Sequence, residues 1–145
     1  MISDRHAQPR QPYGTAYEQM LEKVRYVGAY PTREKADEVV RLVLGGLGRQ
    51  LTGEERADLA GCLPLEAAGV LTARLPDLQS LTGWAFVKDL AARTGASLAT
   101  TRWDTGSVLS VVAAYAGPTL ITRILHQLPT GYALLFGRAE LTPAA

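Results

Sequence analysis

The sequence is poor in the residues from which most catalytic and metal sites are built, because its 145 residues include one cysteine and two histidines. Cys62 has no second cysteine with which to form an internal disulfide or a cysteine-based metal cluster, and a lone thiol fits the reducing cytosol. The motifs His-Glu-x-x-His, Gly-x-Ser-x-Gly and Cys-x-x-Cys are absent as well. We therefore expect a cytoplasmic protein that is not an enzyme, with no catalytic residue, no metal and no cofactor.

An excess of charge of either sign is also missing. Fifteen Lys and Arg residues against 14 Asp and Glu residues leave a formal net charge of +1. A dedicated nucleic-acid-binding protein normally carries a clear basic excess, so we expect no nucleic-acid partner. Hydrophobic residues make up 47% of the chain and charged residues 20%, which is typical of a globular domain rather than a disordered one.

One long stretch, residues 105–122, has no charged residue. Gly117 and Pro118 interrupt it, and its pattern matches a helix pair elsewhere in the chain, so we expect a buried core segment and no membrane span. The first 14 residues lack the apolar run of a signal peptide. Residues 1–14 and 142–145 are predicted to be tails.

What the sequence does contain is an internal repeat. Residues 43–71 align with residues 108–136 at a shift of 65, and apolar positions coincide along this stretch without a gap. The pair Leu63-Pro64 falls on the pair Leu128-Pro129. We infer that the chain is a duplication of one helical unit.

The first unit, residues 15–72, is predicted to contain four helices. Thr15 and Thr52 each open a capping-box pattern, in which a glutamate three residues later reaches back to the start of the helix. A second helix begins near Thr32. The third ends at Leu63, because the ring of Pro64 cannot continue a helix but can begin the next one.

The second unit, residues 82–141, repeats this plan after a linker at residues 73–81. Thr82 is expected to cap its first helix, Pro118 to begin its third and Thr130 to cap a short last helix. No long segment shows the alternation of a half-buried strand. The predicted fold is all-α, a compact bundle of about eight helices made from two pseudo-symmetric four-helix units.

This pattern resembles the bacterial family called domain of unknown function 2267 (DUF2267). The resemblance runs from about residue 17 to residue 141, and its most specific part is Leu-Pro-x-x-Tyr-x-x-Leu-Phe at residues 128–136. It implies an all-helical fold with paired repeats in a cytosolic bacterial protein, and it carries no established activity or catalytic residue. The chain departs from the family pattern at Gly45, Gly46 and Gly48, where the family more often has good helix formers.

These three glycines could suggest a phosphate-binding loop, but their spacing argues against one. Glu54 and Glu55 stand after Gly53, where a P-loop needs Lys and then Ser or Thr. We expect the glycines to lie within a helix, where together they cost about 3 kcal/mol relative to alanine. Close crossing of a neighbouring helix would offset this cost, and close approach of a ligand is the alternative.

Other reactive side chains have structural explanations. His126 suits the C-terminal end of a helix, and Cys62 suits a core or boundary position. The acidic residues at positions 54–58 suit a helix start. The basic residues at positions 25–56 alternate with acidic ones, as on a solvated helix surface.

The two halves differ in charge, which suggests where a function resides. Residues 1–83 hold 21 of the 29 charged side chains, whereas residues 84–145 hold only eight. Residues 108–116 are apolar around nearly the whole helix, so this helix is either the centre of the bundle or an interface. We expect a non-catalytic interaction or scaffold module that forms a homo-oligomer or binds another protein through its second unit. The candidate contact residues are Trp84, Trp103, Val111, Ala114 and Tyr115. The alternative is a small-molecule-binding protein that uses the groove between the two units.

Overall fold

The computed structural model describes residues 14–138, and this part of the chain forms seven α-helices and no strand. The predicted all-α fold is confirmed. In chain order the helices are α2 (Thr15–Gly28), α3 (Arg33–Gly48), α4 (Gly53–Cys62), α5 (Leu65–Thr72), α6 (Gly83–Thr94), α7 (Leu98–Ala116) and α8 (Pro118–Gln127).

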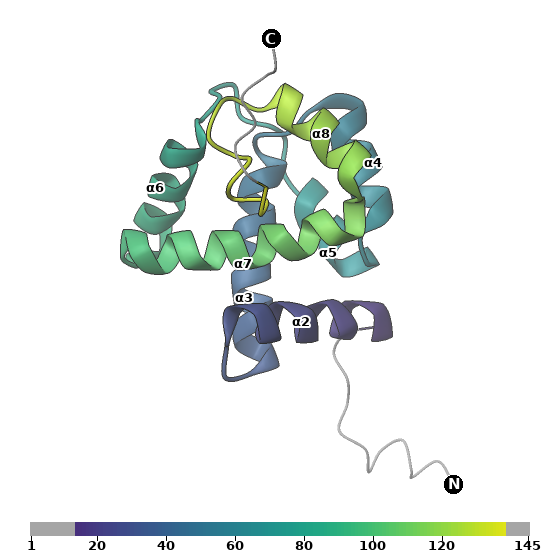
Figure 1. Cartoon of the computed structure of the whole chain (residues 1–145), viewed down its shortest axis with the longest axis vertical. Helices are drawn as coiled ribbons and strands as arrows, with labels where there is room; N and C mark the ends of the chain where they lie inside the picture. The colour runs from purple at the N-terminus through teal and green to yellow at the C-terminus, as the bar shows by residue number, and fades with distance from the viewer. Residues whose placement is uncertain (1–13, 139–145) are drawn as a thin grey trace, which may run out of the picture.

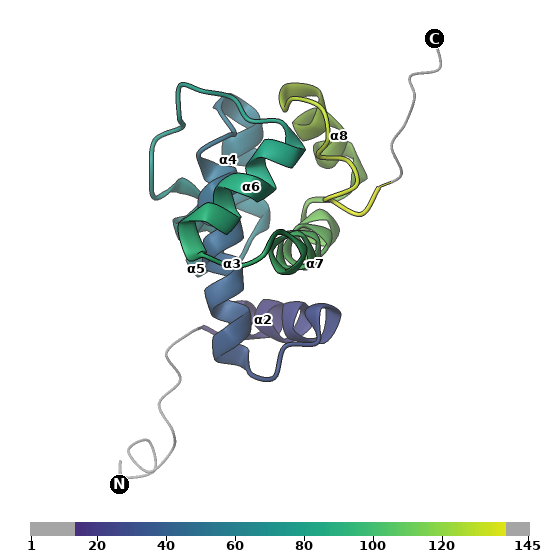
Figure 2. The same ribbon diagram turned by 90° about the vertical axis from the view of Figure 1, so that its left-hand side faces the viewer.

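Two long helices, α3 and α7, cross near the middle of the molecule (Figure 1). Both α2 and α6 contact each of these central helices. α5 packs against α3 and α4, while α8 contacts α4 and α7. Figure 2 shows α6 in front of α3, with the segment between α5 and α6 arching out at one edge.

The apolar helix α7 is a core helix over most of its length. Val108, Leu109 and Val112 are fully buried, and Val111 is nearly so. The helix contacts α2, α3, α4, α6 and α8, and packing on so many sides explains why it lacks a polar face. Residues 108–112 thus belong to the bundle core, whereas residues 113–116 are partly exposed and Ala114 is exposed, so the interface alternative stays open for that end of the helix.

The predicted last helix, expected to begin at Thr130, is wrong. Residues 128–138 form a series of turns. Gly131 and Gly137 have φ values of +101° and +83°, which lie outside the right-handed helical region. The segment is nonetheless packed, because Tyr132, Leu135 and Phe136 are buried.

Some of the helix bounds recur at the spacing of the predicted repeat. α4 covers residues 53–62 and α8 covers residues 118–127, while α3 and α7 begin at residues 33 and 98. Both comparisons give a shift of 65, but the ends of α3 and α7 lie 68 residues apart, as do the starts of α2 and α6. The duplication therefore stays a prediction. The symmetric arrangement of two four-helix units stays a prediction, since the element that follows α8 in the described residues is not a helix.

Side chains cap several helices as their sequence predicts. Thr32 accepts a hydrogen bond from the Lys35 N–H at 3.1 Å, and Thr82 accepts one from the Ala85 N–H at 3.1 Å. The two predicted capping boxes are wrong, because α2 has Gly14 at its N-cap and Thr52 makes no side-chain capping bond.

The glycines of α3 lie in a helix, as predicted, and two of them permit close helix packing. A Cβ atom at Gly48 would lie 1.9 Å from the carbonyl oxygen of Leu71 on α5, and one at Gly46 would lie 3.0 Å from Leu90 on α6. A Cβ atom at Gly45 would meet nothing closer than Arg49 Nη1, at 4.0 Å. Packing therefore accounts for Gly46 and Gly48 but not for Gly45.

Candidate functional site

A pocket of about 360 Å³ lies where α3, the end of α5, the segment at residues 73–82 and α6 meet. This position is the seam between the two predicted units. Four arginines and four small or apolar residues line it: Arg41, Leu42, Gly45, Arg49, Val70, Ala73, Arg74 and Arg93. Its volume falls within the range of small-molecule sites. We call it the four-arginine pocket.

One wall of the pocket is a stripe along α3. Arg41, Gly45 and Arg49 are spaced four residues apart, which places them on one face of the helix. The backbone positions of the two arginines are separated by about 12 Å along the helix axis. Gly45 lies midway between them and has no side chain to fill the gap, so the surface of the helix is open there.

Arg49 is the unusual group of this site. Its side chain is 15% exposed, and its guanidinium lies 3.9 Å from a carboxylate oxygen of Asp77 and 3.9 Å from one of Asp89. These separations are too long for hydrogen bonds. No hydrogen bond joins the guanidinium to another residue among residues 14–138. Since none of the fully buried side-chain nitrogen or oxygen atoms in this part of the chain lacks a hydrogen-bond partner, the Arg49 nitrogens still touch solvent, where an acceptor can reach them.

Burial lowers the pKa of Arg49, and the neighbouring positive charge of Arg93 lowers it further. Asp77 and Asp89 act in the opposite direction, and Arg74 adds a smaller lowering. Burial and the neighbouring arginines therefore disfavour the charged form of Arg49. A bound anion would relieve both the repulsion and the lack of an acceptor.

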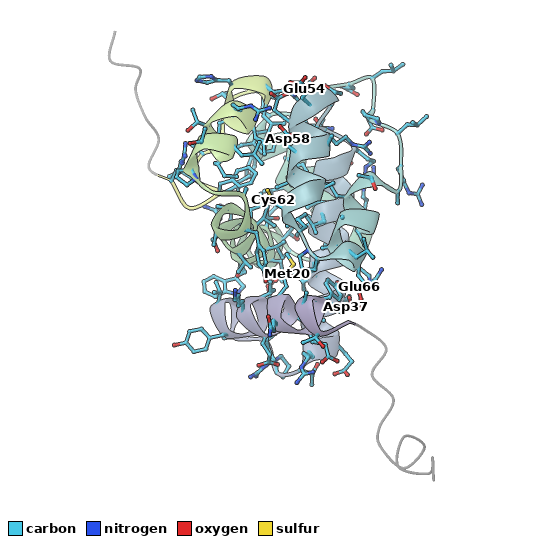
Figure 3. All side chains as sticks on the ribbon, turned by 90° about the vertical axis from the view of Figure 1, so that its right-hand side faces the viewer. Met20, Asp37, Glu54, Asp58, Cys62 and Glu66 are labelled. Atoms are coloured by element: carbon cyan, nitrogen blue, oxygen red, sulfur yellow. The ribbon has the colours of Figure 1, made fainter. Side chains whose placement is uncertain are left out.

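The other three arginines of the pocket differ in whether their side chains already bind a carboxylate. Arg41 donates from Nε to Asp37 at 3.0 Å, and Arg93 donates from Nε to Asp89 at 2.8 Å. Asp37 lies beside α2 (Figure 3). The exposed Arg74 has no side-chain ion pair or hydrogen bond to any described residue. Arg49 and Arg74 are thus the two cations with donors to offer.

Arg56, which does not line the pocket, binds the backbone at its edge. Its guanidinium donates to the carbonyl oxygens of Gly48 at 3.2 Å and Leu71 at 3.3 Å, at the C-terminal ends of α3 and α5. It also donates to the carbonyl oxygen of Arg74. A cation at two helix C-termini is favourable, and the same contacts position the backbone that carries Arg74.

The sequence offered a groove between the two units as an alternative binding site, but none of the candidate residues it predicted lines this pocket. The basic residues of α3 were expected on a solvated surface, which is wrong for Arg49 because α5, α6 and the connecting segment cover it. The available signal was the stripe Arg41, Gly45, Arg49, with a glycine at its centre. No sequence rule indicates that Arg74 and Arg93 approach this stripe, since they are distant in the chain.

The residues predicted as an interaction surface are only partly brought together. Val111 and Ala114 of α7 line a hollow of about 440 Å³ with Tyr26 and Val27 of α2. Val111 itself is buried, and Tyr115 is half-buried with Lys23 Nζ 4.8 Å from its ring centroid. We call this surface the α2–α7 face.

The two tryptophans are both more than half exposed. Trp103 donates from its indole nitrogen to the carbonyl oxygen of Gly28 at 3.0 Å, so it lies at the end of α2. Trp84 lies in the first turn of α6, where Lys88 Nζ is 5.9 Å from its ring centroid. Trp84 does not line the hollow of the α2–α7 face.

The remaining reactive groups do not form a second site. Cys62 is exposed at the end of α4, so the expected core or boundary position is wrong. The acidic residues of α4 are partly bound by α8, because Arg123 donates to Glu55 at 3.2 Å and Asp58 at 2.9 Å. Figure 3 shows Glu54, Asp58 and Cys62 along α4. In the described residues, no three His, Cys, Asp or Glu side chains are grouped so that they could hold a metal ion.

None of the helices between residues 14 and 138 combines the length and apolar character that crossing a membrane requires.

The family model described as "Uncharacterized conserved protein (DUF2267)" matches residues 17–135. The chain belongs to the DUF2267 family. No curated protein matches the sequence. The match extends over all seven helices of this DUF2267 protein, from the third residue of α2 to the turns after α8, and includes the whole four-arginine pocket.

Proposed function

We propose that this DUF2267 protein is a non-catalytic binding protein for small molecules that carry an oxyanion. The ligand occupies the four-arginine pocket at the seam of two duplicated helical units. The observation that carries the proposal is Arg49, a guanidinium that is 15% exposed and 3.9 Å from its nearest carboxylate oxygens. Guanidinium groups bind oxyanions through two parallel hydrogen bonds, and the open face of Arg49 is free to make them.

The local charge supports an anionic ligand. The four arginines that line the pocket face three aspartates nearby, Asp37, Asp77 and Asp89, which leaves one positive charge in excess. No carboxylate lines the pocket itself. An anion that enters therefore meets cationic walls and apolar patches, while Asp77 and Asp89 approach Arg49 without lining the pocket, so the net charge of the group favours the anion by one positive charge.

Thermal and chemical unfolding in the presence of inorganic phosphate tests the proposal. At a phosphate concentration ten times the dissociation constant, we expect the free energy of unfolding to rise by about 1.4 kcal/mol. The Arg49→Gln variant should gain less than about 0.5 kcal/mol under the same conditions. Arg102→Gln, at an exposed position of α7 outside the pocket, is the matched control and should respond like the wild type. Equal stabilisation of all three proteins would indicate a general salt effect and contradict the proposal.

A second candidate function is self-association through the α2–α7 face. Tyr26 is 84% exposed beside the apolar hollow, and exposed aromatic residues are enriched at protein interfaces. We propose a second copy of this chain as the partner. In a dimer related by a twofold axis, the apolar hollow of each copy would face the same surface of the other. Glu22 at its edge is already held by Arg25 and Arg33, so apolar contact rather than ion pairing supports this association.

Sedimentation velocity over increasing concentration tests this second proposal. We expect the wild type to form a dimer at high micromolar concentration, and Tyr26→Ser to weaken the dimer at least tenfold. Leu78→Ser, at a fully exposed position of the segment between α5 and α6, should leave the dimer unchanged. A wild type that sediments as a monomer throughout would refute the proposal.

A further inference from the structure

We infer that the ligand of the four-arginine pocket is an organic phosphate monoester whose phosphate binds at the Arg49 end while its apolar body lies over Gly45. The inference rests on the proposed function, since it names the chemical class of the oxyanion and its orientation. Three features of the pocket lead to it: its size, the unequal distribution of its charge and the apolar surface at its centre.

The pocket is too large to be filled by inorganic phosphate alone. A volume of about 360 Å³ equals the share of roughly twelve water molecules in the liquid. Inorganic phosphate has five heavy atoms, so most of this space stays with solvent when phosphate binds alone. A ligand that fills the pocket therefore carries a body in addition to its anionic group.

The positive charge is concentrated at one end. Arg49 and Arg93 approach the same carboxylate, because Asp89 Oδ2 lies 3.9 Å from Arg49 and 2.8 Å from Arg93, and Arg74 lines the pocket beside them. The charges of Arg93 and Arg74 also lower the pKa of Arg49. Arg49, Arg74 and Arg93 thus form a cluster contributed by α3, the segment after α5 and α6. A phosphate monoester offers three terminal oxygens and nearly two negative charges to such a cluster, while a carboxylate offers two oxygens and one charge.

The other end of the pocket suits an uncharged group. Arg41 is already held by both carboxylate oxygens of Asp37, at 3.0 and 3.2 Å. Between this pair and the Arg49 end lie Gly45, Leu42 and Val70, the last two packed on the hydrophobic core. Gly45 has no packing reason to be a glycine. Its bare backbone leaves room for a short apolar chain to lie on α3 beside Arg49 Nη1, which is 4.0 Å from the Cβ position of Gly45.

Isothermal titration calorimetry with three probes tests this inference on the full chain. The probes are inorganic phosphate, butyl phosphate and butanoate. For the wild type, we expect butyl phosphate to bind at least tenfold more tightly than either inorganic phosphate or butanoate. Arg49→Gln should weaken butyl phosphate at least tenfold.

The Gly45→Leu variant tests the contact of the ligand's apolar body separately from the contact of its phosphate group. The leucine side chain would occupy the space over α3 beside Arg49 Nη1, which lies 4.0 Å from the Cβ position of Gly45. Butyl phosphate should therefore lose more affinity than inorganic phosphate does. Gly61→Leu is the matched control, because Gly61 is an exposed glycine within a helix and a Cβ atom there meets nothing within 4 Å. Circular dichroism establishes that both variants are folded, and Gly45→Ala provides a smaller intrusion at the same site.

The outcomes are distinct. If the wild type binds inorganic phosphate as tightly as butyl phosphate, or if Gly45→Leu weakens both equally, the orientation over Gly45 is wrong although the oxyanion function stands. Tighter binding of butanoate than of butyl phosphate would overturn the phosphate class. Absence of binding by all three probes would overturn the proposed function and this inference with it.

Discussion

Gly45, Gly46 and Gly48 lie within one turn of α3, yet a methyl group would meet different surroundings at each of them. At Gly48 the neighbouring atom is a backbone oxygen at 1.9 Å, which cannot move without displacing α5. At Gly46 the neighbours are the side chains of Leu90 and Phe86, at 3.0 and 3.2 Å. At Gly45 the space is open.

Substituting alanine at these positions should therefore change stability in opposite directions. We expect Gly45→Ala to raise the free energy of unfolding by about 0.5–1 kcal/mol, because alanine is the better helix former and has room. Gly48→Ala should lower it by about 1–3 kcal/mol or more, because the α3–α5 contact must open. Urea unfolding of the two variants beside the wild type measures both effects. The same sign for both would contradict the assignment.

At this scale, sequence could predict the role of the glycine cluster but not the role of each member. Three glycines in a helical pattern indicate close packing, which is correct for Gly46 and Gly48. Only the position of α5 and α6 in space distinguishes them from Gly45. For the same reason the burial of Arg49 was not predictable, since it depends on Asp77, Asp89 and Arg93 meeting it from elsewhere in the chain.

Helices of this protein are linked at their ends as well as along their faces. Arg56 of α4 satisfies carbonyl groups at the C-terminal ends of both α3 and α5, and Gln127 of α8 binds the backbone of Thr52 from both its amide atoms. Terminal carbonyl groups have no partner within their own helix. Arg56 supplies such partners to α3 and α5, whereas Gln127 binds the residue that precedes the first turn of α4.

Replacing Arg56 should affect both the helix ends and the ligand site. We expect Arg56→Gln to lower the free energy of unfolding by about 1–3 kcal/mol, the range for hydrogen bonds to a charged group. It should also weaken phosphate binding several-fold, because the carbonyl group of Arg74 loses its contact. Urea unfolding and calorimetry on the same preparation measure the two effects, with Arg102→Gln as the control. Unchanged phosphate affinity would show that Arg56 does not position the rim.

The starts and ends of most helices could be predicted from local chemistry, because Thr32, Thr82 and the prolines act on their own neighbourhood. The last segment could not. Its apolar residues are buried as a helix would bury them, but Gly131 approaches Gly83 and adopts a left-handed φ. That contact is between segments far apart in the chain, and no local pattern encodes it.

At the scale of the whole molecule, two buried tyrosines connect distant parts of the chain. Tyr30 donates from its hydroxyl to Asp104 at 2.6 Å, and Tyr132 donates to the carbonyl oxygen of Leu81 at 2.9 Å. Burial raises the pKa of both hydroxyls above the ordinary value of 10, and the hydrogen bond to Asp104 adds to the effect for Tyr30.

The protein should accordingly lose stability in alkali. The unfolded chain releases these protons near pH 10, before the folded chain does, so the free energy of unfolding falls as pH rises above about 10. Each tyrosine contributes a slope of up to about 1.4 kcal/mol per pH unit. Urea unfolding on both sides of that pH should show a shallower decline for Tyr30→Phe and for Tyr132→Phe. Tyr26→Phe, at an exposed position, is the control, and identical slopes in all variants would contradict this origin.

The walls of the four-arginine pocket come from three stretches of chain that separate when the molecule opens: α3, the segment that follows α5, and the end of α6. An ion seated among them acts as a removable cross-link. If the proposed site binds an oxyanion, separation of α6 and the connecting segment from α3 requires the ion to leave. Opening of this seam would then become rarer as the oxyanion concentration of the medium rises.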